Sequence, residues 1–375
     1  MEIRFALQHE AEACNDFYNR VSQTNRTLAQ WQWGFLREGP RTDTIPYVIA
    51  MDSGDIVGTQ AFIPLRMIDP QGIFWTVKSE DTLVDPSHRG RKLFEAMYEP
   101  LFVFLKQHGI HCIWGFTPAT RAFEKAGFTI PQSTSQVFFP FTGRAFVTLF
   151  ERYAGLSRSG VMRRVRDGVI RAAGSMAGAY SAFRIKRCSA TTAGTSSDLE
   201  IRVLESPPPQ AGELSERFIR LYGGTTIYRD APYLQWRLFE NPYVKAVMLG
   251  AFVRSELVGW VAYALGDDGM GYLVDILVAP LPESGQDPAG IVKRLLIKTV
   301  EDLRKTGAHG VRGWHVNGHP FDTMVLRIAG GLGFYHIRRG FSVVLYVNPE
   351  SDRHERLTSF HNWFVTRLFT EGVLG

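Results

Sequence analysis

Cysteine is scarce in this sequence, and no stretch is apolar enough to cross a membrane. The three cysteines, Cys14, Cys112 and Cys188, lie far apart and fit neither a CxxC pair nor a Cys/His metal spacing. We therefore expect no disulfide framework, no bound metal and a cytoplasmic location. The first ten residues lack a basic segment followed by an apolar run, so we expect no signal peptide. Because no window approaches the roughly 18 apolar residues of a membrane span, membrane contact would have to be peripheral.

The chain does contain enough apolar residues for two cores. Its 375 residues exceed one ordinary domain. A hydrophobic content of 45% and a charged content of 21% are typical of globular proteins. The net charge of +5 permits an anionic ligand. Nucleic acid is not an expected partner, because the aromatic cluster at 31–35 lacks the interleaved basic residues of a base-stacking platform.

Periodicity predicts alternating helices and strands in the first part of the chain. A helical pattern runs through 10–39, and an apolar helix face recurs through 89–107, where Pro100 should kink or split the helix. Short apolar runs bounded by turn residues predict strands. These strands cover 46–51, 56–63, 73–84 and 110–115, and a second helix covers 120–125.

The same pattern returns after residue 200. Val274-Asp-Ile-Leu-Val-Ala-Pro280 resembles Glu80-Asp-Thr-Leu-Val-Asp-Pro86, which places Asp275 opposite Asp81. Leu332-Gly-Phe334 likewise resembles Ala126-Gly-Phe128. Several such pairs in the same order indicate a tandem duplication of one α/β unit. We expect a first domain at 1–142, a second, degenerate domain at 200–350, and an amphipathic helix in the C-terminal segment 351–375.

A basic segment separates the two copies. Residues 143–199 predict helix followed by a flexible Ser/Thr/Ala/Gly-rich linker at 190–197. Arginine and lysine far outnumber acidic residues between 152 and 187. One interpretation is a solvated helix face packed against the two copies, and the other is a site for an anionic membrane surface or envelope precursor.

The stretch Ser79–Phe94 is the best candidate for a functional site. It predicts a strand carrying Glu80 and Asp81, a turn at Pro86, and a basic, glycine-containing start of a helix. Free N–H groups and the positive end of the helix dipole at such a start suit a phosphate group. The second copy keeps the strand, but its loop at 281–288 is longer and acidic. The first copy is therefore the expected ligand-binding one.

Val84-Asp-Pro-Ser-His-Arg-Gly-Arg-Lys-Leu-Phe94 and Ala126-Gly-Phe128 resemble motifs of the GNAT superfamily of N-acetyltransferases, in a tandem arrangement. The resemblance implies an α/β fold of two tandem, mixed and mostly antiparallel sheets flanked by helices. It also implies that each sheet splays between its fourth and fifth strands, where acetyl-CoA or another acyl-CoA binds. No metal belongs to this chemistry.

The resemblance assigns cofactor contacts to specific positions. These are Leu83, Val84, Arg89, Gly90, Arg91, Lys92, Leu93, Phe94, Thr117 and Arg121. Two of them depart from the motif: Lys92 stands at a usual glycine, and Phe94 at a usual Gly or Ala. Phe123 stands where many members have the tyrosine that protonates the leaving thiolate, so that general acid is absent.

Acyl transfer to an amine also needs a base, for which Glu80 and Asp81 are the candidates. Strand alternation predicts that their side chains point to opposite faces of the sheet. Asp81 has a counterpart in Asp275 and Glu80 has none, which favours Glu80. The resulting hypothesis is an acyl-CoA-dependent N-acyltransferase acting on an amine, such as an amino sugar or envelope precursor. The alternatives are a Fem-like aminoacyltransferase that uses aminoacyl-tRNA, and a non-catalytic acyl-CoA-binding protein.

Overall fold

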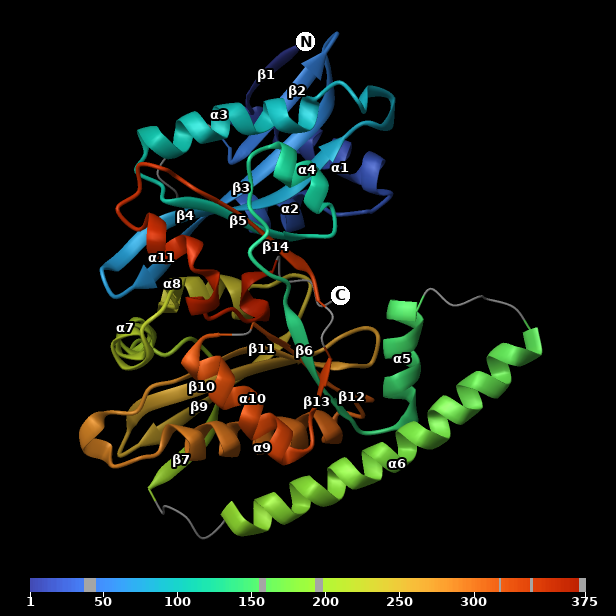
Figure 1. Cartoon of the computed structure of the whole chain (residues 1–375), viewed down its shortest axis with the longest axis vertical. Helices are drawn as coiled ribbons and strands as arrows, with labels where there is room; N and C mark the ends of the chain where they lie inside the picture. The colour runs from blue at the N-terminus through green and yellow to red at the C-terminus, as the bar shows by residue number, and fades with distance from the viewer. Residues whose placement is uncertain (37–44, 155–159, 193–197, 317, 338–339, 371–375) are drawn as a thin grey trace. The chain divides into compact units, whose positions relative to one another are not determined.

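The structure of the protein is a computed structural model (Figure 1). It describes residues 1–36, 45–154, 160–192, 198–316, 318–337 and 340–370. The chain divides into two compact units that interleave along the sequence. Unit 1 comprises Met1–Ser133, Gly224–Tyr228 and Phe341–Trp363. Unit 2 comprises Thr134–Gly223, Arg229–Gly340 and Phe364–Gly375.

Unit 1 contains a seven-stranded sheet whose strands follow the order β1-β2-β3-β4-β5-β14, with β8 paired to β3. The pairing is antiparallel throughout except between β4 and β5, which are parallel. The strands are β1 Glu2–Phe5, β2 Tyr47–Asp52, β3 Asp55–Asp69, β4 Gly72–Val84, β5 Cys112–Thr117, β8 Thr226–Ile227 and β14 Ser342–Val347.

Unit 2 contains a second seven-stranded sheet with the order β13-β6-β12-β11-β10-β9-β7. Its one parallel pair is β11 with β12, in the place of β4 with β5. The strands are β6 Ser135–Pro140, β7 Leu199–Leu204, β9 Ala246–Val253, β10 Glu256–Leu265, β11 Gly271–Val278, β12 Gly310–His315 and β13 Tyr335–Ile337. The matching order confirms the predicted fold class of two tandem mixed sheets.

One strand of each sheet comes from an unexpected part of the chain. Strand β6 lies at the end of the expected first domain but pairs with β12 in the sheet of unit 2. Strand β14 lies at the end of the expected second domain but pairs with β5 in the sheet of unit 1. The compact units therefore differ from the expected ranges 1–142 and 200–350 at both of these strands. Pairing between residues so far apart in sequence leaves no local signal.

Helices cover both sheets. They are α1 Ala11–Ser22, α2 Leu28–Phe35, α3 Leu93–Gln107, α4 Thr120–Lys125, α5 Gly143–Ala154, α6 Gly160–Thr192, α7 Ala211–Tyr222, α8 Ala231–Leu234, α9 Pro288–Lys305, α10 Pro320–Leu332 and α11 His354–Thr358. Helix α3 continues through Pro100 instead of splitting there. A proline removes one N–H from the ladder, and in α3 the buried residues on both sides of it still pack against the sheet.

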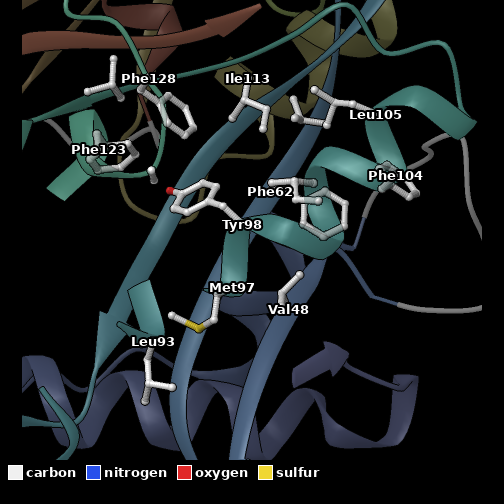
Figure 2. Packing of buried hydrophobic residues seen from close by; sticks show 14 of the residues in the cluster. Val48, Phe62, Leu93, Met97, Tyr98, Phe104, Leu105, Ile113, Phe123 and Phe128 are labelled. Atoms are coloured by element: carbon white, nitrogen blue, oxygen red, sulfur yellow. The ribbon is translucent and has the colours of Figure 1, made fainter. Parts of the chain in front are cut away.

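The core of unit 1 lies between α3, α4 and one face of the sheet (Figure 2). Figure 2 shows side chains of α3 packed against β2, β3 and β5, with Tyr98 among them. The buried members include Val48, Phe62, Val77, Met97, Leu101, Phe104 and Phe123. This arrangement fixes the start of α3 beside the end of β4.

The described part of the C-terminal segment, residues 351–370, does not form the single amphipathic helix that was expected. Helix α11 ends at Thr358, and the described chain beyond it makes only short 3-10 turns at Phe360–Asn362 and Arg367–Phe369. The aromatic residues that suggested a helix, Phe360, Trp363 and Phe364, are nevertheless buried. The segment contributes to unit 1 up to Trp363 and to unit 2 from Phe364, so its path is set by tertiary packing.

Candidate functional site

Strands β4 and β5 separate soon after they meet, and this fork is the centre of the candidate site. The parallel pairing consists of Val77 with Ile113 and Lys78 with Trp114. Beyond it, β4 continues to Val84 and β5 to Thr117. The two backbones are still close at Gly115, where an added Cβ would lie 3.2 Å from the carbonyl oxygen of Ser79. The sheet thus opens where the sequence resemblance implied.

A β-bulge in β4 lies at this fork. In the pairing with β3, Thr59 faces Leu83 and Ala61 faces Glu80, so the single residue Gln60 stands opposite two residues of β4, Asp81 and Thr82. Asp81 has a φ of 44°, in the left-handed region. A bulge of this kind inserts an extra residue, leaves it outside the ladder and redirects the side chains around it.

Hydrogen bonds to Tyr98 of α3 show how the bulge shifts the alternation of β4. The Tyr98 hydroxyl lies 2.8 Å from Ser79 Oγ and 3.2 Å from Thr82 Oγ1. In a regular strand, residues three apart point to opposite faces, yet Ser79 and Thr82 both face α3. The extra residue accounts for the difference.

The bulge therefore corrects the expectation that Glu80 and Asp81 point to opposite faces. Glu80, next to Ser79, points away from α3 and pairs with Lys78 on the same strand. Asp81 also points away from α3, because its carboxylate accepts a hydrogen bond from the hydroxyl of Tyr47. Both acids lie on the face covered by α1 and α2.

The Asp81 carboxylate is enclosed by groups that bind it. Arg26 Nη1 lies 2.8 Å from Asp81 Oδ2, and both side chains are largely buried. Trp31 Nε1 of α2 donates to the Tyr47 oxygen at 3.1 Å, which extends the network to a helix. Burial raises the pKa of Tyr47 well above its ordinary value, so the phenol keeps the proton that it donates. The network ties β4 to the segment between α1 and α2.

Unit 2 repeats this arrangement at the matching position. Asp275 binds Arg229 through two hydrogen bonds, Nε to Oδ2 at 2.9 Å and Nη2 to Oδ1 at 3.0 Å. Trp260 Nε1 donates to the same carboxylate at 2.9 Å. An aspartate on the fourth strand thus pairs with an arginine in both copies, which supports a structural role for Asp81.

The loop between β4 and α3 presents backbone N–H groups and positive charge together. Gly90 and Lys92 have φ values of 80° and 57°. The first hydrogen bond of α3 runs from Ala96 N–H to the Lys92 carbonyl oxygen. The N–H groups of the first turn precede this bond, and Lys92 at the N-cap has no side-chain oxygen that could accept from them. Arg89, Arg91 and Lys92 are exposed around them.

Asp85 holds the preceding turn in place without capping the helix. Its carboxylate accepts from Ser87 N–H at 3.0 Å and pairs with Arg20 at 2.6 Å. Hydrogen bonds from Ser87 and Arg20 keep the pKa of Asp85 well below its usual range. Because the charge of Asp85 is already paired with Arg20, it does not offset the positive charges of the adjoining loop.

The matching loop of unit 2 has lost these features. Asp287 caps α9 by accepting from Ala289 N–H at 3.1 Å and from Gly290 N–H at 3.2 Å. A carboxylate thus stands where a phosphate would bind.

The C-terminal segment lies against the corresponding strands of unit 2. Thr366 Oγ1 donates to Asp275 on β11 at 2.8 Å, and Arg367 lies over the rings of Tyr272 on β11 and Trp314 on β12. These two differences distinguish unit 2 from unit 1, and the degeneracy of the second copy stays a prediction.

The other predicted site residues are spread around the fork of unit 1. Leu83 and Val84 are half-buried at the end of β4, and the Val84 carbonyl oxygen accepts from Arg89 Nε at 3.4 Å. Thr117 Oγ1 accepts from Ala119 N–H at 3.0 Å, which caps the turn into α4. Arg121 is exposed on α4. Contact with a cofactor stays a prediction for each of them.

Phe123 and Phe94 belong to the aromatic core rather than to an open surface. Their ring centroids lie 5.1 Å apart, and Phe123 also packs against Tyr98 at 5.7 Å and Phe128 at 5.1 Å. The position that carries a catalytic tyrosine in many GNAT proteins is therefore an apolar contact in this chain.

Sequence reasoning missed a cluster of polar groups beside the fork. Gln60, Ser79, Thr82 and Tyr98 are linked by hydrogen bonds, including Gln60 Nε2 to Ser79 Oγ at 3.1 Å. Gln60 and Tyr98 are fully buried, and burial raises the pKa of Tyr98. The sequence did contain one signal of this cluster, because Gln60, Ser79 and Thr82 are polar residues within otherwise apolar strands. Without the bulge, alternation would have placed Ser79 and Thr82 on opposite faces.

Comparisons with known proteins agree with this geometry. Residues 2–130 match the family model described as an acetyltransferase (GNAT) domain. No curated protein matches the chain. A GCN5-related N-acetyltransferase from Anabaena variabilis aligns with a TM-score of 0.59 at 10% identity, covering 92% of this chain and 72% of that one.

Two further solved structures share the fold. Eis1 from Mycobacterium abscessus aligns with a TM-score of 0.53 at 13% identity, covering 93% of this chain and 74% of that one. A tandem GNAT protein from the clavulanic acid biosynthesis pathway aligns with a TM-score of 0.50 at 11% identity, covering 94% of this chain and all of that one. At these identities the similarity shows a shared fold only.

Proposed function

We propose that this protein is an N-acyltransferase working in unit 1, because residues 2–130 match the model of a GNAT acetyltransferase domain and the chain shares the fold of a tandem GNAT protein. It moves an acetyl or other acyl group from coenzyme A to an amine. One observation carries the proposal: the β4–β5 fork of unit 1 adjoins an uncapped, basic helix start, whereas unit 2 has both features blocked.

The residues of the β4–α3 loop fit a pyrophosphate group. The first-turn N–H groups of α3 would donate to its oxygens, and Arg89, Arg91 and Lys92 would add charge. The backbone of β4 beyond Lys78, where the pairing with β5 ends, would align the extended arm of the carrier along the fork. When bound, the thioester supplies the acyl group. We propose no coenzyme A site in unit 2, because Asp287 caps the helix start there and Arg367 lies over Trp314 of β12.

Glu80 is the proposed base. It lies beside the fork on the α1/α2 face, where it pairs with Lys78. Asp81 is already bound by Arg26 and Tyr47, so its proposed role is to hold the bulge. An amine arriving on this face would lose its proton to Glu80, directly or through water.

The leaving thiolate also needs a proton, and Phe123 has none to give. The nearest hydroxyls on the α3 side of the fork are those of Ser79, Thr82 and Tyr98. We assign proton delivery to this cluster, with Tyr98 donating through the β4 hydroxyls. Burial raises the pKa of Tyr98, so the phenol carries its proton in the resting protein.

A second candidate function follows from Phe123. Because the usual acid is an apolar core residue, a protein that binds acyl-CoA without turnover is the alternative. This alternative also predicts that acyl-CoA binds, but it predicts that no acylated amine is formed.

For the transferase, an amino sugar is the first acceptor class to test.

Calorimetry with acetyl-CoA and longer acyl-CoAs tests the proposal. We expect binding, and the double substitution Arg91→Gln with Lys92→Gln should weaken it about tenfold because two phosphate-facing charges are lost. Lys125→Gln on α4 is the matched control and should leave affinity unchanged. If no acyl-CoA binds, the proposal is wrong. Binding without release of free CoA, across a panel of amines, selects the non-catalytic alternative.

A further inference from the structure

The long helix α6 of unit 2 has two different faces. Its inner face packs through small residues: a Cβ added to Gly174 would lie 2.7 Å from Gly143 Cα, and one added to Gly178 would lie 2.6 Å from the Phe141 carbonyl oxygen. Ser181 and Ile185 continue this buried face. Such close backbone contact leaves the helix anchored on one side and open on the other.

The outer face carries an apolar stripe. Val169, Met176, Tyr180 and Phe183 are 65%, 70%, 53% and 62% exposed. Their spacings of seven, four and three residues bring them within an arc of about 60° on the helix, along about 21 Å of its axis. Large apolar side chains clustered in this way on a surface mark a site of interaction.

The charges around the stripe indicate what covers it. Lys186 and Arg187 are exposed at its C-terminal end. The one acidic residue between 167 and 189 is Asp167, which helical spacing places on the packed side with Gly174 and Gly178. The outer face thus combines apolar and cationic groups with no negative charge of its own.

We propose that the outer face of α6 docks on an anionic phospholipid surface. The helix would lie in the plane of the interface, with Met176, Tyr180 and Phe183 inserted among the acyl chains and Lys186 and Arg187 at the headgroups. Within the described parts of the chain, no helix is long and apolar enough to cross a membrane, so the contact is peripheral.

The same charges disfavour the other occupant, a second copy of this chain. Pairing two α6 helices along the stripe would bring two cationic surfaces together without a carboxylate between them, and like charges at an interface oppose association. An anionic surface is complementary to both the stripe and its flanking charges.

Co-sedimentation of the full-length protein with vesicles tests the inference. We expect binding to mixed phosphatidylglycerol–phosphatidylcholine vesicles, much weaker binding to phosphatidylcholine alone, and release by salt. Met176→Ser with Phe183→Ser removes the stripe, and Lys186→Glu with Arg187→Glu inverts the charge. Each pair should lower vesicle binding about tenfold or more. Leu221→Ser, which alters an exposed apolar residue on α7, is the matched control and should bind as the unsubstituted protein does.

Three results would overturn the inference. They are no binding to acidic vesicles, equal binding by the stripe variant, or a dimer in solution that the stripe variant converts to a monomer. The last result would assign the face to a second copy. Circular dichroism and acyl-CoA affinity of each variant show that the fold and the unit 1 site remain intact, so failure here leaves the proposed transferase function standing.

Discussion

Replacing Asp81 by Asn separates a structural role from a catalytic one. The substitution keeps an oxygen that can accept from Tyr47 but removes the negative charge beside Arg26, whose side chain is 10% exposed. Breaking a buried ion pair costs about 3–5 kcal/mol, because the remaining charge stays desolvated. The surviving hydrogen bond to Tyr47 favours the lower end, so we expect the free energy of unfolding to fall by about 3 kcal/mol.

Thermal unfolding followed by circular dichroism measures this loss. For a unit of this size, about 3 kcal/mol corresponds to a fall in Tm on the order of 10 °C. The matched change in the second copy is Asp275→Asn, beside the fully buried Arg229. It should destabilise unit 2 at least as much while leaving acyl-CoA affinity unchanged at temperatures where the protein is folded.

A double-mutant cycle with Arg26→Gln sharpens the test. If the two residues stabilise the fold through each other, the double variant should be less destabilised than the sum of the two single variants. The reasoning is refuted if Asp81→Asn leaves the unfolding transition unchanged and lowers kcat by orders of magnitude. That result would make Asp81 the base in place of Glu80.

Two further predictions concern other buried groups. Tyr98→Phe should lower kcat by about tenfold or more at unchanged acyl-CoA affinity, measured by steady-state kinetics and calorimetry; an unchanged kcat would remove Tyr98 from the proton path. Burial of His319 lowers its pKa to about 4 from an ordinary 6.5, so the folded state favours the neutral ring. Its contribution to stability is complete above pH 6.5 and is lost as pH falls toward 4, by up to about 3 kcal/mol. Chemical denaturation across this range should show the loss in the native protein and a smaller one in His319→Gln; equal losses would contradict the assignment.

The fold class was predictable because its signals are local or repeated. The start of α3 shows itself in Arg89, Gly90 and Lys92 within a few residues, and the parallel strand–helix units recur in the same order in both halves. Repetition supplies the information that a single short motif lacks. The expected degeneracy of the second copy also followed from its loop sequence, which contains the capping Asp287.

The candidate site was only partly predictable. Glu80 and Asp81 were identified as a pair, but their relation was not, because the extra residue of the bulge reverses the alternation on which such reasoning depends. Tyr98 was hidden for the same reason: its partners Ser79 and Thr82 share a face only through the bulge.

Patterns within short stretches of the sequence therefore predicted two units of one α/β fold and the basic start of α3. Tertiary structure decided three matters on which local order is silent. Strand β6 joins the sheet of unit 2 and strand β14 the sheet of unit 1, the C-terminal segment binds Asp275 of unit 2, and the bulge places both acids of β4 on one face. The physical reason is common to all three. Pairing and burial between residues far apart in sequence depend on which surfaces meet, and no short window of sequence contains both partners.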